Sequence, residues 1–205
     1  MGKETQGKYI AGTNSDFEMD AENNEFLNTD DVYDSVSTYI DNLKQEMKMN
    51  DKTKIDSFIF YFIGHGVHSH GQDCLMGTTG EATTVKSIQE LLIGLNAKKY
   101  FLFFECCRKD TGTKHMLNKE HKDYRPSWDT NFTMVYAAKQ MMITPDVTGK
   151  TMTSCLVEHL RTKKVIKANE LEDTLIDLWD TRQERIRFTP KVETTPRFGK
   201  ITEFP

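Results

Sequence analysis

A histidine between two glycines and a pair of adjacent cysteines are the residues of this sequence best suited to carry out chemistry. His65 lies between Gly64 and Gly66, and Cys106 and Cys107 follow 41 and 42 residues further along the chain. A cysteine becomes a strong nucleophile when a nearby base or positive charge favours its thiolate, and a histidine can do this and later protonate a leaving amine. If the fold brings them together, they would form a Cys/His nucleophilic site, where backbone N–H groups of Gly66 and of the cysteine itself would bind the oxyanion of an acyl intermediate.

Two apolar runs must position these side chains. Residues 57–63 end directly before Gly64, and residues 100–104 end directly before Glu105 and the two cysteines. Continuous apolar runs of this length, rich in aromatic residues, predict strands that are buried on both faces of a parallel sheet. Between the runs, Thr83 or Thr84 is expected to begin a helix. Because a strand, a helix and a strand in this order make neighbouring parallel strands, we expect His65 and Cys107 to lie side by side at the carboxyl edge of the sheet.

The remaining segments complete a single α/β domain with a mostly parallel sheet and helices on both faces. We expect Thr29 to cap a helix with one apolar face, and residues 64–80 to form a glycine-rich and histidine-rich loop. Further predicted elements are a third core strand over 132–138, helices over 152–160 and from 169 or 170, and an extended edge strand over 191–204. The domain is expected to span 29–205, after an irregular acidic segment over 1–28, with a polar linker over 109–131.

Composition excludes several classes of protein. The chain of 205 residues has a formal net charge of −4 and no basic stripe, so we expect no binding to nucleic acid. It has no apolar run long enough to span a membrane and no apolar segment of a signal peptide at its beginning. Its four cysteines are sparse, which favours free thiols in the reducing cytosol. We therefore expect a cytoplasmic protein without a membrane anchor.

Two groups of residues could bind a metal, zinc or calcium, but the spacing of neither group favours a metal site. His65, His68, His70 and Cys74 are zinc-type ligands, but their spacing fits no common zinc finger. The carboxylates between residues 14 and 28 do not have the spacing of an EF-hand calcium loop. No metal and no cofactor is expected. A plainer interpretation also stays open, in which the two cysteines are buried structural thiols and His65 only ends a strand.

The motif at the two strand ends resembles the caspase-like cysteine proteases. Caspases carry an apolar strand that ends in Ser-His-Gly, and then Gln-Ala-Cys-Arg-Gly about 50 residues later. Paracaspases carry Gly-His-Gly and Asp-Met-Cys-Arg-Lys, and the sequence Gly64-His65-Gly66 with Glu105-Cys106-Cys107-Arg108-Lys109 is closer to these. The resemblance covers residues 30–200 approximately. It implies the caspase–haemoglobinase fold, with a large-subunit-like half over 29–108 and a small-subunit-like half over 132–205, and the activity of a cysteine endopeptidase that acts on peptides and proteins.

The resemblance assigns roles to individual residues. It makes Cys107, the residue before Arg108, the nucleophile and His65 its base, while Arg108 is expected to be structural or pocket-lining rather than catalytic. Because neighbouring residues of a strand point to opposite faces, Cys106 should be buried and inert, and Glu105 should lie on the same face as Cys107.

The same resemblance implies a preference for the substrate residue before the scissile bond, P1. Caspases line the P1 pocket with arginines and with the glutamine two residues before the nucleophile, which suits aspartate, whereas this sequence has Glu105 there. Asp146 falls where a pocket arginine is expected, and Asp16 or Asp20 is the candidate for a further pocket residue. An acidic pocket should hold arginine or lysine and reject aspartate, as in paracaspases and metacaspases. The alternative role for Glu105 is a local salt bridge with Arg108 or Lys109.

Departures from the family pattern leave further alternatives. Lys109 stands where caspases have glycine, and the stretch before His65 is short for the family, which would fit a fragment of a longer protein. The other functions considered are a catalytically silent signalling or scaffold module and an aspartate-specific caspase. Basic residues in the linker would allow self-cleavage. Family members often dimerise through an edge strand, so we expect a homodimer through residues 191–204.

Overall fold

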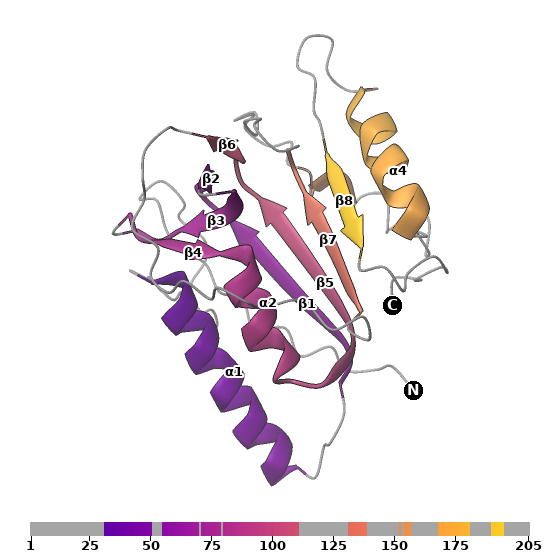
Figure 1. The fold of residues 1–205 in the computed structure, drawn as a ribbon. Helices are drawn as coiled ribbons and strands as arrows, with labels where there is room; N and C mark the ends of the chain where they lie inside the picture. The colour runs from indigo at the N-terminus through magenta and orange to yellow at the C-terminus, as the bar shows by residue number, and fades with distance from the viewer. Residues whose placement is uncertain are drawn as a thin grey trace.

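The computed structural model describes residues 31–50, 55–69, 71–78, 80–110, 131–138, 152, 154–156, 168–180 and 190–194. Its centre is a four-stranded sheet in the order β1-β5-β7-β8 (Figure 1). The strands β1 (Ile55–Ile63), β5 (Ala97–Glu105) and β7 (Phe132–Tyr136) are parallel neighbours. The last strand, β8 (Lys191–Thr194), is antiparallel to β7 and lies at the edge of this sheet. The predicted mostly parallel sheet and its three core strands are thus confirmed.

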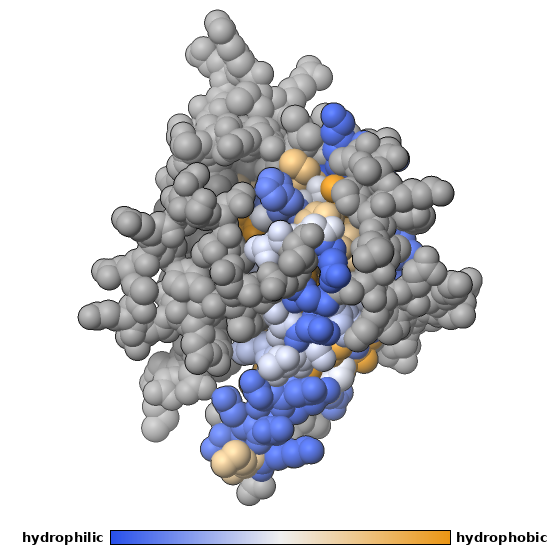
Figure 2. Space-filling model, turned by 90° about the vertical axis from the view of Figure 1, so that its left-hand side faces the viewer, coloured by the Kyte–Doolittle hydropathy of each residue, from blue (hydrophilic) through white to orange (hydrophobic). Residues whose placement is uncertain are grey.

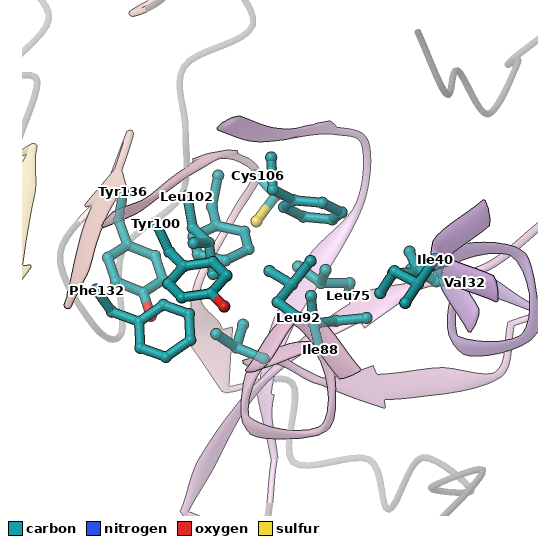
Figure 3. Close-up of a cluster of buried hydrophobic side chains, with 14 of the residues drawn as sticks. Val32, Ile40, Leu75, Ile88, Leu92, Tyr100, Leu102, Cys106, Phe132 and Tyr136 are labelled. Atoms are coloured by element: carbon teal, nitrogen blue, oxygen red, sulfur yellow. The ribbon is translucent and has the colours of Figure 1, made fainter. Parts of the chain in front are cut away.

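Helices pack against both faces of this sheet, as predicted. On one face, α1 (Val32–Met49) and α2 (Val85–Ile93) pack against a core, called here the first core, that includes Tyr100, Leu102 and Phe104 of β5 (Figure 3). On the other face, Phe101 and Phe103 of the same strand belong to a second core with buried residues of α4 (Ala168–Asp180). Successive side chains of β5 therefore enter different cores, which explains why its sequence is apolar without a break.

Side-chain caps begin the two helices of the first face. Thr84 caps α2, and its hydroxyl accepts a hydrogen bond from the backbone N–H of Ser87 at 3.0 Å. Asp31 caps α1 and accepts from the backbone N–H of Tyr33 at 2.8 Å. The prediction that Thr29 caps this helix was wrong. Asp31 caps it instead, because aspartate is a favoured N-cap residue and the positive end of the helix dipole stabilises its carboxylate.

The segment predicted as a loop over 64–80 instead forms most of a second sheet. Its strands are β2 (Gly66–Ser69), β3 (Gln72–Met76), β4 (Ala82–Thr84) and β6 (Lys109–Asp110), in the order β4-β3-β2-β6. Gly71 makes the turn between β2 and β3 with a positive φ of 74°, a conformation that glycine adopts without strain. Val67, Cys74 and Ala82 form a small core of their own. The loop prediction failed because these strands are too short for their apolar alternation to stand out among glycine and histidine.

The parts of other predicted elements that the structure describes agree with the sequence. Residues 152 and 154–156 are helical, and Met152, Cys155 and Leu156 enter the second core. The exposed surface of α1 is mostly hydrophilic in the view from the side of this helix (Figure 2), although Met49 at its end is exposed. Among the described helices, none combines the length and the apolar character that a membrane span requires.

Candidate active site

The pairing of β1 with β5 brings the two predicted catalytic residues to the same end of the sheet. Ile63 pairs with Glu105 in the parallel register, and the backbone N–H of Gly64 donates to the carbonyl of Glu105 at 3.3 Å. His65 and Cys107 each lie two residues beyond this pair. The expectation that the βαβ unit places both residues at the carboxyl edge of neighbouring strands is therefore met by the backbone.

Gly66 packs directly against the two cysteines. A Cβ atom at this position would lie 2.5 Å from the carbonyl oxygen of Cys107 and 2.6 Å from Sγ of Cys106, which is closer than non-bonded atoms approach. Only glycine therefore fits without a shift of the backbone. This contact joins the residue after His65 to the cysteine segment. The carbonyl of His65 in turn accepts from the backbone N–H of Met76 at 2.9 Å, which ties it to β3.

The two cysteines have different surroundings. Cys106 is 4% exposed and enters the first core, where Figure 3 shows it among apolar side chains. Burial raises the pKa of its thiol from 9.0 to about 12, with smaller contributions from neighbouring charges. Cys107 is partly exposed, and the side chain of His65 is exposed. The burial of Cys106 agrees with its predicted inertness, because a protonated thiol is a poor nucleophile.

Glu105 is almost completely buried at the end of β5. The residue is 6% exposed, and its Oε2 accepts a hydrogen bond of 2.6 Å from the hydroxyl of Tyr61 on β1. A buried carboxylate needs such donors or a cation nearby to stay charged. Tyr61 was not singled out in the sequence, where it is one aromatic residue in an apolar strand.

Arg108 is a buried link between the two sheets. It is 4% exposed, and its guanidinium pairs with Asp73 of β3 at 2.5 Å and with Glu193 of β8 at 3.3 Å. The guanidinium also donates to the carbonyl of Ala138 at 3.5 Å. Its central carbon, Cζ, lies 3.8 Å from the centre of the Tyr136 ring. These contacts fit a structural residue, which is one of the two roles expected for Arg108; the other, pocket-lining, stays a prediction.

Asp73 has a second partner on the neighbouring strand. Its Oδ1 lies 2.9 Å from Nδ1 of His68, while its Oδ2 contacts Arg108. Asp73 and His68 are opposite each other in the antiparallel register of β2 and β3. This carboxylate was not predicted from the sequence, because residues 64–80 were expected to form a loop, in which no cross-strand neighbour is defined.

Some predicted site residues lie outside the part of the chain that the structure describes. These are Asp146, Asp16 and Asp20 of the predicted P1 pocket, and His70 of the zinc alternative. Within the described residues, no group of three or more histidine, cysteine, aspartate or glutamate side chains could hold a metal ion. Cys74 is buried, and burial raises the pKa of its thiol to about 11, which disfavours a thiolate ligand.

Comparison with known proteins agrees with the fold and the motif. The sequence profile of the caspase domain, a family of cysteine peptidases, matches residues 17–194, and the chain belongs to this family. Among solved structures, caspase-1 from Spodoptera frugiperda is similar, with a TM-score of 0.55 and 14% identity over 81% of this chain and 70% of that one. A Geobacter sulfurreducens protein is similar with a TM-score of 0.52 and 13% identity, over 80% and 72% of the two chains. No curated protein sequence matches the chain. At these identities, the solved structures support the caspase-like fold alone.

Proposed function

We propose that this chain is a cysteine endopeptidase in which Cys107 is the nucleophile and His65 is the base. One observation carries the proposal: Gly66 packs against the backbone carbonyl of Cys107 and the side chain of Cys106 without room for a Cβ atom. This contact, together with the equal offset of His65 and Cys107 from the Ile63–Glu105 pair, supports an imidazole and a thiol at one place. Membership of a cysteine peptidase family agrees with the reaction.

The proposed reaction is acyl transfer through a thioester. The Cys107 thiol gives its proton to His65, and the sulfur attacks the carbonyl carbon of the peptide bond. The backbone N–H groups of Gly66 and Cys107 bind the oxyanion that develops. The C–N bond then breaks as His65 returns the proton to the leaving amine. A water molecule, deprotonated by His65, finally attacks the thioester, which releases the acid and restores the thiol.

A basic P1 residue is the second part of the proposal. The carboxylate of Glu105 supports it. This residue lies two positions before Cys107 and is buried at the end of β5 beside Tyr61. A buried carboxylate attracts a guanidinium or ammonium group and repels the aspartate that caspases accept. From this preference and the Gly64-His65-Gly66 motif, we further propose that the chain is closer to the paracaspases than to the caspases. Asp146 and Asp16 complete the pocket in this proposal.

A homodimer through β8 is proposed for the assembly. This strand lies at the edge of the described sheet, so its outer backbone groups can pair with another strand.

The test compares fluorogenic peptides that end in arginine, lysine or aspartate, with the wild type and the Cys107→Ala and His65→Ala variants. Cleavage after arginine or lysine that both variants lose is the expected result. Cleavage after aspartate would keep the peptidase and overturn the acidic pocket. If folded wild-type protein cleaves none of the peptides and no peptidyl probe labels Cys107, the chain is a silent module of the same fold.

A further inference from the structure

Asp73 connects the two segments that carry the proposed catalytic residues. It lies on β3, whose Met76 N–H binds the carbonyl of His65, so β3 and His65 are held together through the backbone. Its carboxylate contacts the guanidinium of Arg108 at 2.5 Å, and Arg108 is the residue after Cys107. A continuous series of contacts thus links His65 to β3, and links Asp73 of β3 to Arg108, the neighbour of Cys107.

The Asp73–Arg108 pair is well shielded from solvent. The side chains are 16% and 5% exposed, so water screens their attraction poorly. The contact with His68 also holds the Asp73 carboxylate against the strand β2, whose first residue is Gly66. The segment after Cys107 joins the same sheet, because Val67 pairs with Lys109 and His68 with Asp110. Within the described residues, two residue pairs make this junction, so a side-chain contact across it should add to its stability.

We propose that Asp73 is a positioning residue, which keeps Cys107 within reach of His65 by holding Arg108 against the β2–β3 hairpin. This proposal rests on the proposed function, since it concerns the same two catalytic residues. Asp73 itself touches neither substrate nor the reacting atoms. Its removal should let the Cys107–Arg108 segment move away from the hairpin while the central sheet, which the cores hold, stays folded.

A direct effect of the Asp73 charge on the Cys107 thiol and a positioning effect of Asp73 would change the reactivity of this thiol in opposite directions. This difference makes the proposal testable. Asp73 is one of the charges that raise the pKa of the neighbouring Cys106 thiol, because a negative charge disfavours a thiolate. If Asp73 acted on the site only through its charge, its neutralisation would favour the thiolate and speed the reaction of Cys107 with an alkylating reagent. If Asp73 positions the segment, neutralisation separates the thiol from its base, and alkylation slows.

The experiment measures the iodoacetamide alkylation rate of Cys107 at pH 7 in the folded protein, and kcat and KM for the preferred peptide. Peptide mapping identifies the labelled thiol, and Cys107 is the one cysteine of the four that is not buried. In Asp73→Asn we expect alkylation to slow by about tenfold, because an ordinary thiol is only a few per cent ionised at neutral pH. We also expect kcat to fall with little change in KM, and circular dichroism to stay unchanged.

Two matched variants separate the explanations. Glu193→Gln removes the other carboxylate of Arg108, which lies on β8 rather than on the hairpin, and should keep the alkylation rate within about twofold. Asp56→Asn makes the same substitution at an exposed pair with Lys98 and should have no effect. Equal slowing in Glu193→Gln and Asp73→Asn would overturn the proposal, because neutralising Arg108 would then be the only function of Asp73. Faster or unchanged alkylation in folded Asp73→Asn would overturn it as well.

A second variant covers the case in which Asp73→Asn does not fold. Arg108→Lys keeps the positive charge but cannot span Asp73, Ala138 and Glu193 together, and should slow alkylation in the same direction. A wild-type rate in folded Arg108→Lys would overturn the proposal. The His65→Ala variant tests the proposed function separately. If it alkylates as fast as the wild type, the Cys107–His65 pair is absent and both proposals fall, whereas slowing in His65→Ala without slowing in Asp73→Asn removes the positioning role alone.

Discussion

The hydroxyl of Tyr61 donates a 2.6 Å hydrogen bond to Oε2 of Glu105, across the neighbouring strands β1 and β5. The parallel register pairs Tyr61 with Phe103 and Ile63 with Glu105, so Tyr61 and Glu105 are diagonal neighbours on one face of the sheet. A buried carboxylate is thereby held at the end of a strand, two residues before the proposed nucleophile.

Glu105→Gln should abolish the preference for basic P1 residues without unfolding the protein. The amide has the size of the carboxylate and can still accept from Tyr61, but it carries no charge. We expect kcat/KM for an arginine peptide to fall by about 30-fold to 1,000-fold, the cost of removing one partner from a buried charge pair. Glu170→Gln, at an exposed position of α4, is the matched control and should leave kcat/KM unchanged. An unaltered arginine preference in Glu105→Gln would place the specificity of the pocket elsewhere.

Gly66→Ala should destabilise the protein and remove activity together. The added methyl group would meet the carbonyl of Cys107 and the side chain of Cys106 at less than 3 Å, so the backbone must shift. We expect a loss of about 1–3 kcal/mol in the free energy of unfolding, as for other overpacked sites. Urea denaturation and peptide cleavage check this. Gly71→Asn is the control, since no atom of the described residues lies within 4 Å of a Cβ there and asparagine tolerates a positive φ. An active and stable Gly66→Ala would contradict the tight contact.

Arg108→Met should be among the most destabilising single substitutions in the described region. It removes the cation that compensates Asp73 and leaves a carboxylate with little access to water. Breaking one side of a buried ion pair costs about 3–5 kcal/mol, which urea denaturation measures. The double variant Arg108→Met/Asp73→Asn should recover part of this loss, because the uncompensated charge is gone. If the double variant is less stable than the sum of the two single losses predicts, the pair is not the source of the cost.

Cys106 should contribute to alkaline sensitivity. Burial raises the pKa of its thiol from 9.0 to about 12. Between these values the unfolded chain releases the proton and the folded chain keeps it, so the free energy of unfolding falls as pH rises. Between pH 8 and pH 10 this group should remove about 1 kcal/mol of stability. Cys106→Ala lacks the group, so its urea midpoint should fall less over this interval than that of the wild type. Equal losses would show that Cys106 does not remain protonated in the folded protein.

The strands at the centre of the domain were predictable because their physical cause is local. Residues 100–104 are apolar on both faces of the sheet, and a helix pattern separates this run from the one before Gly64. The right-handed βαβ connection then makes the strands parallel neighbours. For the same reason, the positions of His65 and Cys107 at one sheet edge followed from the sequence. Strand alternation predicted that Cys106 and Cys107 point to opposite faces, and the family resemblance made Cys106 the buried one.

The hairpin and its contacts depended on long-range pairing instead. The strands β2 and β3 are too short to have a clear apolar period, and their stability comes from each other and from their small core. Asp73 lies 35 residues from Arg108, and Glu193 lies 85 residues from it. Nothing in the local sequence of Asp73 distinguishes it from a solvated loop carboxylate.

The amino-acid sequence by itself thus determined the central sheet, the place of the proposed catalytic pair and the charge at position 105, since these depend on local pattern and on the handedness of the chain. Only the tertiary structure decided which partners the charged groups have. Asp73 reaches Arg108, and Tyr61 reaches Glu105, because separate strands come together in one register. An ion pair or hydrogen bond between distant residues depends on this register, which the residues near each partner do not encode.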